Sequence, residues 1–358
     1  MKNIKIKYKS LYKDTTCFNK SIIYNEQLEL NNDAKSSESS ESSESNQSAC
    51  EVIMNDKNIV ELFITESVLS AEQFIKPVCN FPFGQRIKIL VLSGGGIKGI
   101  SHIGAIKCLE KLNILKDIDT FIGTSIGSFI SGMLCMGYTP KEIKTFVFKL
   151  NYELIKDTDF NLFIESYGLD DGTKIEHIIK TLIKQKFENV NITLNELFKI
   201  TNKTFISVTT CVNTGNTHYL DHINSPNIPL YIAIKMSLSI PFLFCPVVYN
   251  GVLYADGGLT CNYPIDIFSD RINEVFGVYL YNISKKNTIE SLQDYIIKLI
   301  FSATDNVTCE LLKKYIKNTT IIKLENMEIT NFDVTLKQKK ELYLKGLNTC
   351  LDKLCPSV

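Results

Sequence analysis

Apolar and polar positions along the chain change their pattern near Arg86. The run 87–92 (IKILVL) is short, apolar and rich in β-branched residues, which predicts a buried strand. A glycine loop at 94–99 follows, and then an amphipathic helix from about His102 to Leu112. The same order of strand, tight loop and helix recurs over 120–136. This repetition is typical of an α/β domain with a parallel sheet.

The later part of the chain continues this alternation. Residues 246–255 predict a β-hairpin, because Asn250-Gly251 favours a type I′ turn between two apolar runs. A short helix is expected near 59–69, without an assigned role. Further helices are predicted at 139–150, 173–186, 193–199, 229–239, 288–317 and 335–354, and strands at 204–212 and 319–324.

The N-terminal region has a different composition. Residues 36–48 repeat Ser-Ser-Glu and have nothing apolar to bury, so we expect a disordered linker; phosphorylation of its serines is the alternative. The predicted organisation is an extension over 1–84, a domain over 85–285 whose motifs lie within 88–270, and a C-terminal helical segment over 286–358.

Charge and cysteine content narrow the class of protein. Lys+Arg and Asp+Glu both number 39, so the chain has no net positive charge that would attract nucleic acid. A nucleic acid is therefore not expected as a partner. The eleven cysteines include no CxxC pair, which predicts neither a zinc site nor a disulfide framework and favours a reducing compartment. No signal peptide or apolar span of transmembrane length is recognised. We therefore expect a cytoplasmic protein that meets membranes only peripherally.

The glycine loop at 94–99 (GGGIKG) permits three interpretations. A Walker A loop is excluded, because Ile100 occupies the position of the required lysine. A dinucleotide-binding fingerprint matches formally at the first, third and sixth positions, and Asp119 follows about twenty residues later. The third interpretation is an oxyanion hole, in which glycine amides at a helix start face one point.

Residues 123–127 (GTSIG) match G-x-S-x-G between a predicted strand and a predicted helix. In that context Ser125 is a candidate nucleophile, and an N-capping serine is the simpler alternative. Both glycine-containing loops follow neighbouring strands, so in a parallel sheet they meet at the same edge. This pairing favours a nucleophile that faces its oxyanion donors.

A serine nucleophile needs a base. His102 adjoins the glycine loop, His177 lies in a polar helix, and His218 and His222 lie in an apparent loop. None of them ends a strand, which is where a base is expected. Asp256 does, in the sequence Ala-Asp-Gly-Gly, although Asp-Gly also forms ordinary tight turns.

Three blocks resemble the patatin-like phospholipases, namely residues 93–112, 121–134 and 236–266. The resemblance is to the bacterial and viral branch, which carries lysine in the glycine loop, here Lys98. It implies a three-layer α/β fold with a central, mostly parallel sheet flanked by helices. It also makes 85–285 the catalytic domain.

The resemblance implies a lipid acyl hydrolase of phospholipase A type, with Ser125 as nucleophile and Asp256 as its direct base. No cofactor or metal is expected. The implied oxyanion hole comprises Gly94, Gly95, Gly96 and Ile97, and the supporting residues are Lys98, Gly99, Gly123, Gly127, Gly257 and Gly258.

The implied partners are a phospholipid or other acyl lipid and a membrane surface, and the need for a protein activator is left open. Lysines at 313, 314 and 317, or at 337, 339 and 340, are candidates for contact with anionic headgroups, although a solvated face is the favoured explanation. The rival functions are a lipid- or protein-binding module without activity, a dinucleotide-binding oxidoreductase, and a hydrolase whose base is His218 or His222.

Overall fold

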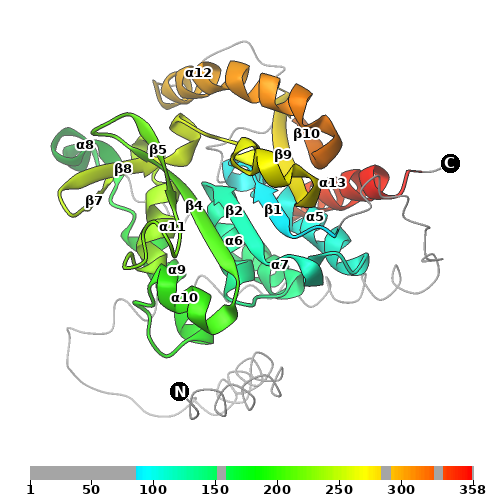
Figure 1. Cartoon of the computed structure of the whole chain (residues 1–358). Helices are drawn as coiled ribbons and strands as arrows, with labels where there is room; N and C mark the ends of the chain where they lie inside the picture. Colours follow the sequence, from blue (N-terminus) through cyan, green and yellow to red (C-terminus); the bar gives the residue numbers. More distant parts are fainter. Residues whose placement is uncertain (1–85, 151–158, 284–291, 326–333, 357–358) are drawn as a thin grey trace, which may run out of the picture. The chain divides into compact units, whose positions relative to one another are not determined.

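The computed structural model describes residues 86–150, 159–283, 292–325 and 334–356. Within them, an eight-stranded sheet has the order β10-β9-β1-β2-β4-β8-β7, with β5 also paired to β4 (Figure 1). Strands β10, β9, β1, β2 and β4 are parallel neighbours, and β5, β7 and β8 join through antiparallel pairs. The strands are β1 Ile89–Leu92, β2 Thr120–Thr124, β4 Thr204–Cys211, β5 Asn216–Leu220, β7 Val247–Tyr249, β8 Val252–Asp256, β9 Val275–Ile283 and β10 Thr319–Glu325. The predicted α/β fold with a mostly parallel sheet is confirmed.

Helices flank this sheet (Figure 1). They are α5 Ile100–Lys111, α6 Ile126–Cys135, α7 Pro140–Lys149, α8 Phe160–Ser166, α9 Thr173–Lys186, α10 Leu194–Thr201, α11 Leu230–Leu238, α12 Leu292–Lys314 and α13 Leu336–Leu354. Short 3-10 turns are η2 Gly96–Gly99, η3 Leu115–Asp117, η5 Gly257–Leu259, η6 Ile265–Glu274 and η7 Ile316–Asn318. A separate two-stranded sheet pairs β3 Gly168–Asp170 with β6 Phe242–Phe244.

Strand β1 shows how the sheet is buried on both faces. Successive side chains of a strand point to opposite faces. Leu90 and Leu92 belong to the larger apolar cluster, which includes buried residues of α5, α6 and α13. Ile89 and Val91 belong to a second cluster, with Tyr263 and other side chains from around η6 and the end of α12. A continuous apolar strand is therefore required here, as the sequence indicates.

Local sequence signals explain several boundaries. Asn250 and Gly251 both have positive φ, so the predicted type I′ turn between β7 and β8 is confirmed. Helices α7, α10 and α13 begin with capping boxes. In each, a threonine hydroxyl accepts from the backbone amide of a Glu or Gln three residues later, whose side chain accepts from the threonine amide. These starts agree with the predicted ones within a residue or two.

The C-terminal helix α13 packs closely on α5. A Cβ added at Gly104 or Gly346 would overlap the backbone of the other helix, so glycine at both positions lets the two helices touch. Lys339 of α13 is buried, and its Nζ donates to the carbonyl oxygens of Val147, Phe148 and Leu150 at the end of α7. The suggestion that Lys339 contacts headgroups is therefore wrong, because burial removes it from any lipid surface.

Four strands, β3, β5, β6 and β9, lie where the sequence pattern predicts none. Strand β9 fills the place between β1 and β10, and its Gly277 weakens the strand pattern because glycine is unusual in strands. The glycine is needed there, since a Cβ would overlap the hydroxyl of Tyr263. His218 lies on β5, not in a loop. The helix predicted at 59–69 lies outside the described residues.

Candidate active site

Ser125 lies in a sharp turn between β2 and α6, with φ 54° and ψ −124°. Such a positive φ is rare for a residue with a side chain. A Cβ at Gly123 would lie 2.1 Å from the carbonyl carbon of Gly127, and one at Gly127 would lie 2.5 Å from the carbonyl oxygen of Leu92. Glycine on both sides of Ser125 therefore lets strand and helix meet closely, which is the geometry expected of a nucleophile elbow.

The backbone at Ser125 is held by Ser237 of α11. The Ser125 amide donates to Oγ of Ser237 at 2.9 Å, and Ser237 Oγ donates to the carbonyl oxygen of Val208 at 2.5 Å. This chain ties the turn to α11 and β4. A neighbouring pair of hydroxyls, Ser128 and Ser207, lies 2.7 Å apart and fixes α6 on β4.

The carboxyl group of Asp256 ends β8 and is buried. Its Oδ1 accepts from the amide of Gly258 at 2.7 Å, and its backbone amide donates to the carbonyl of Ser239 at 2.8 Å. No described residue donates to Oδ2 in standard hydrogen-bond geometry, but the Ser125 hydroxyl is near enough to influence the carboxyl group. Burial raises the pKa of Asp256 to about 6, and interactions with Ser125 and Gly258 oppose that rise.

The glycine loop brings a third element to the same place. A Cβ added at Gly94 would lie 3.4 Å from Cβ of Ser125, so the loop and the serine touch. The amide of Gly94 itself donates to the carbonyl oxygen of Asn262 at 3.2 Å. Gly96 and Ile97 begin the turn η2, where amides have no acceptor within the helix. Of the four predicted oxyanion donors, Gly94 is thus already engaged.

Comparison with known proteins adds to this geometry. The family model described as "Patatin-like phospholipase" matches residues 90–269, which contain the glycine loop, the Ser125 turn and Asp256. The chain belongs to the patatin-like phospholipase family.

Relatives in the patatin-like family come from viruses among other sources. The chain is 32% identical over 278 residues to uncharacterized protein R571 of Acanthamoeba polyphaga mimivirus. The aligned region covers 74% of this chain and 92% of R571. It is 34% identical over 185 residues to probable lipid hydrolase 463L of Invertebrate iridescent virus 6, covering 50% of this chain and 62% of that protein. Among solved structures, VipD from Legionella pneumophila has a TM-score of 0.52 at 17% identity, covering 76% of this chain and 67% of VipD, which is a likeness of fold.

Three histidines of this patatin-like chain have partners other than Asp256. His102 is fully buried, its Nε2 lies 2.8 Å from the carbonyl of Ser93, and burial lowers its pKa to about 4. His222 stacks on Phe198 at 3.8 Å between ring centroids. His218 packs against Tyr254, and strand β4 separates its strand from β8. Among the described residues, no histidine contributes to the pKa shift of Asp256.

Two supporting residues of the patatin-like motif have packing roles. Lys98 is 1% exposed, so its side chain lies inside the protein. A Cβ at Gly99 would lie 2.4 Å from Cγ1 of Ile126, so glycine lets η2 approach the start of α6. Asp119, the acidic partner expected of a dinucleotide site, lies 3.6 Å from the ammonium of Lys88.

Sequence reasoning missed the residues that hydrogen-bond the backbone of the predicted site residues. Ser237, Ser239 and Asn262 all contact site residues. They lie within the block 236–266, yet the sequence assigns none of them a role. In the described part of the chain, no group of three or more potential metal ligands is found. No described helix combines the length and apolar character needed to cross a bilayer.

Proposed function

We propose that this chain is a lipid acyl hydrolase, which cleaves carboxylic ester bonds of phospholipids or related lipid esters. Ser125 is the nucleophile, Asp256 is its direct base, and amides of the glycine loop bind the oxyanion. The observation that carries the proposal is the meeting of three segments at Ser125, namely the elbow, the end of β8 and the loop after β1. Membership of the patatin-like phospholipase family supports the choice of a lipid ester as substrate.

In the first half-reaction, Asp256 takes the hydroxyl proton as Oγ of Ser125 bonds to the ester carbonyl carbon. The carbonyl oxygen becomes an oxyanion, which the loop amides stabilise; each donor contributes about 3 kcal/mol to such a step. The intermediate then collapses, the ester C–O bond breaks, and the leaving alcohol receives the proton from Asp256. The product is an acyl-serine.

In the second half-reaction, Asp256 removes a proton from water, and the resulting oxygen attacks the acyl carbon. Collapse returns the proton to Oγ of Ser125 and releases the fatty acid. A raised carboxyl pKa assists both halves, because a base whose pKa lies nearer the working pH drives proton transfer better. The value of about 6 for Asp256 supports this role.

A lipid substrate also leads us to propose peripheral contact with a membrane surface. The part of the chain that supports this is a set of neighbouring exposed apolar residues, Ile164, Tyr167 and Phe242. Tyr167 directly precedes β3, whose Gly168 pairs with Phe242 of β6, so these residues form one surface patch. Hydrolysis of phospholipid by the purified chain alone would show that no protein activator is required.

The test of the proposed function is covalent labelling and hydrolysis with matched variants. We expect a fluorophosphonate to label the wild type at Ser125, as read by mass spectrometry of peptides. Ser125→Ala should abolish labelling and phospholipid hydrolysis, and Asp256→Asn should slow hydrolysis by at least about 10²-fold.

Two controls make this test specific. Ser302→Ala removes an exposed serine hydroxyl of α12 and should leave hydrolysis unchanged. The double variant His218→Ala/His222→Ala should also remain active, because these rings pack on Tyr254 and Phe198 and no histidine contributes to the pKa shift of Asp256. Full activity in Asp256→Asn, or loss of activity in the histidine variant, contradicts the proposed dyad.

A further inference from the structure

Asn262 lies in the segment between η5 and η6, six residues after Asp256, and is 8% exposed. Its carbonyl oxygen accepts from the amide of Gly94 at 3.2 Å. The residue before it, Cys261, accepts a hydrogen bond from the hydroxyl of Thr124 at 2.9 Å. This short segment therefore binds both the glycine loop and the last residue before Ser125.

The side chain of Asn262 points to the same place as its carbonyl. A Cβ built on Gly94 would lie 2.4 Å from Oδ1 of Asn262 and 3.4 Å from Cβ of Ser125. The amide end of Asn262 and Cβ of Ser125 thus both border the position that a Cβ of Gly94 would occupy. Oδ1 is buried and accepts no hydrogen bond from any described residue.

A buried polar atom without a partner destabilises the folded state, so its presence beside a nucleophile needs a reason. The oxygen and nitrogen ends of a side-chain amide have nearly the same size. A half-turn about the last bond of Asn262 therefore exchanges acceptor for donor without changing the packing. In that rotamer the NH₂ group takes the place of Oδ1, next to the position that Ser125 Cβ also borders.

The glycine loop lacks one donor at this point. The Gly94 amide, which adjoins Ser125, is bound to the carbonyl of Asn262 and is not available to an oxyanion. We propose that the side-chain amide of Asn262 supplies the missing donor. It hydrogen-bonds the oxyanion that forms when Ser125 attacks the ester, together with the amides of Gly95 and Gly96. This role rests on the proposed ester hydrolysis.

A purely structural role for Asn262 makes a different prediction. Its contact with Gly94 uses the backbone carbonyl, which every substitution keeps. Changing only the side chain therefore separates donation to the oxyanion from support of the loop. Asn318 offers a matched control, because it is a buried asparagine (7% exposed) whose amide donates to the carbonyl of Ile272, away from Ser125.

The experiment measures kcat and KM of full-length variants on a soluble short-chain ester. We expect Asn262→Ala to lower kcat by about 10²–10³-fold with little change in KM, as for loss of one oxyanion donor. The nearly isosteric Asn262→Asp should lose at least as much at pH 8, because a carboxylate repels the oxyanion. Asn318→Ala should keep kcat while lowering thermal stability.

A second measurement uses a trifluoromethyl ketone, which forms a tetrahedral oxyanion adduct with an active serine. Its inhibition constant should rise in Asn262→Ala by the same factor as kcat/KM falls, since both report the oxyanion. Wild-type kcat in both Asn262 variants, or an unchanged inhibition constant, overturns the proposal. If the wild type hydrolyses no ester and reacts with no fluorophosphonate, the proposed ester hydrolysis itself fails. An active wild type with fully active Asn262 variants overturns only the role of Asn262.

Discussion

Burial of the Asp256 carboxyl group links activity to stability. In the folded chain its pKa is about 6, above the ordinary value of 3.8 for an aspartate. The folded protein therefore holds a proton that the unfolded chain releases between about pH 4 and 6. The folded state binds more protons in this window, so stability falls as pH rises through it. The ionised base needed for catalysis is thus the form that the fold accommodates less well.

Asp256→Asn should therefore stabilise the protein while it removes activity. At pH 8 we expect a gain in the free energy of unfolding of about 2–3 kcal/mol, which disappears near pH 4. In the wild type, kcat/KM should rise with pH through an apparent pKa of about 6. Urea unfolding at both pH values and a pH–rate profile measure these effects.

The exposed Asp352 provides the control for this prediction. Asp352→Asn should change stability little at either pH, because it replaces a solvated carboxyl group. An Asp256→Asn variant no more stable than wild type at pH 8 contradicts the link between burial and the pKa of Asp256.

Helix α13 stabilises the C-terminal end of α7 through hydrogen bonds to its last carbonyl groups. The last carbonyl groups of a helix accept no hydrogen bond from an amide of the same helix. A cation placed there also interacts favourably with the helix dipole. Lys339 supplies that cation, with Nζ 2.9 Å from the carbonyl oxygen of Leu150 and 3.1 Å from that of Phe148. The lysine thus joins the C-terminal helix to a helix nearly two hundred residues earlier.

Lys339→Met should lower the free energy of unfolding by about 1.5–3 kcal/mol, the usual range for a lost hydrogen bond to a charged group. Lys337→Met is the matched control, since Lys337 lies in the same first turn but is exposed, and should change stability by less than about 0.5 kcal/mol. Urea denaturation followed by circular dichroism compares the two. Equal transition midpoints would show that the buried ammonium contributes nothing.

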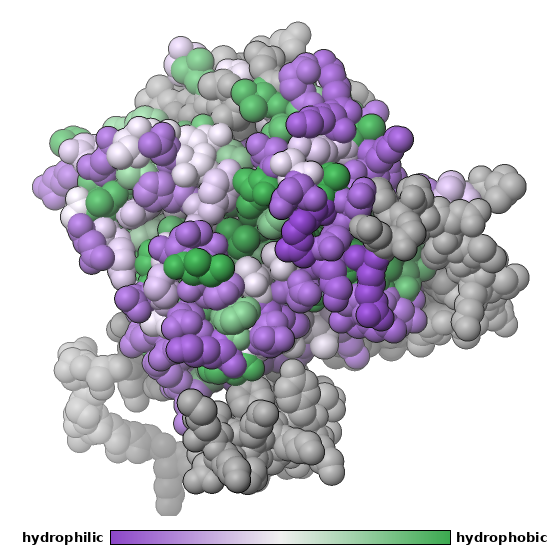
Figure 2. Space-filling model, viewed as in Figure 1, coloured by the Kyte–Doolittle hydropathy of each residue, from purple (hydrophilic) through white to green (hydrophobic). Residues whose placement is uncertain are grey.

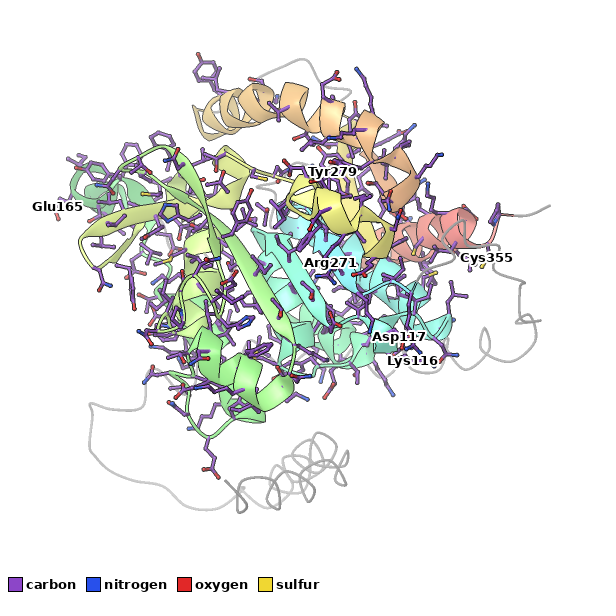
Figure 3. The ribbon with its side chains drawn as sticks, viewed as in Figure 1. Lys116, Asp117, Glu165, Arg271, Tyr279 and Cys355 are labelled. Carbon is purple, nitrogen blue, oxygen red and sulfur yellow. The ribbon has the colours of Figure 1, made fainter. Side chains whose placement is uncertain are left out.

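On the face seen in Figure 2, the described residues present many hydrophilic side chains with separate apolar patches between them. Two contacts hold the patch of Ile164, Tyr167 and Phe242 together. The ring centroids of Phe163 and Phe242 lie 6.1 Å apart, and α8 packs on β3. Figure 3 shows Glu165 of the same helix far from Tyr279, which lies on β9. Ile164 is 80% exposed and Tyr167 is 64% exposed, so the patch is available to a lipid surface.

Ile164→Ser/Tyr167→Ser should reduce sedimentation with neutral phosphatidylcholine vesicles several-fold, because two apolar side chains no longer enter the lipid. Hydrolysis of a soluble short-chain ester should remain at the wild-type rate. Ile223→Ser is the control, since Ile223 is 73% exposed outside this patch. Undiminished vesicle binding by the double variant would remove the patch from the proposed membrane contact.

The sequence by itself determined the local conformations that carry the chemistry. Strand, glycine loop and helix follow from the apolar run 87–92 and from the lack of Cβ atoms in the loop. The turn at Ser125 follows from the flanking glycines, and the hairpin before Asp256 follows from Asn250-Gly251. Each of these depends on neighbours in the chain, so pattern and spacing suffice to predict it.

Only the tertiary structure decided how these parts act on one another. The pKa of Asp256 depends on burial by several elements, and the engagement of the Gly94 amide depends on Asn262, distant in sequence. The insertion of β9 between β1 and β10 and the burial of Lys339 are likewise settled by which surfaces meet. Burial and long-range hydrogen bonding are properties of packed surfaces, and no local pattern encodes them.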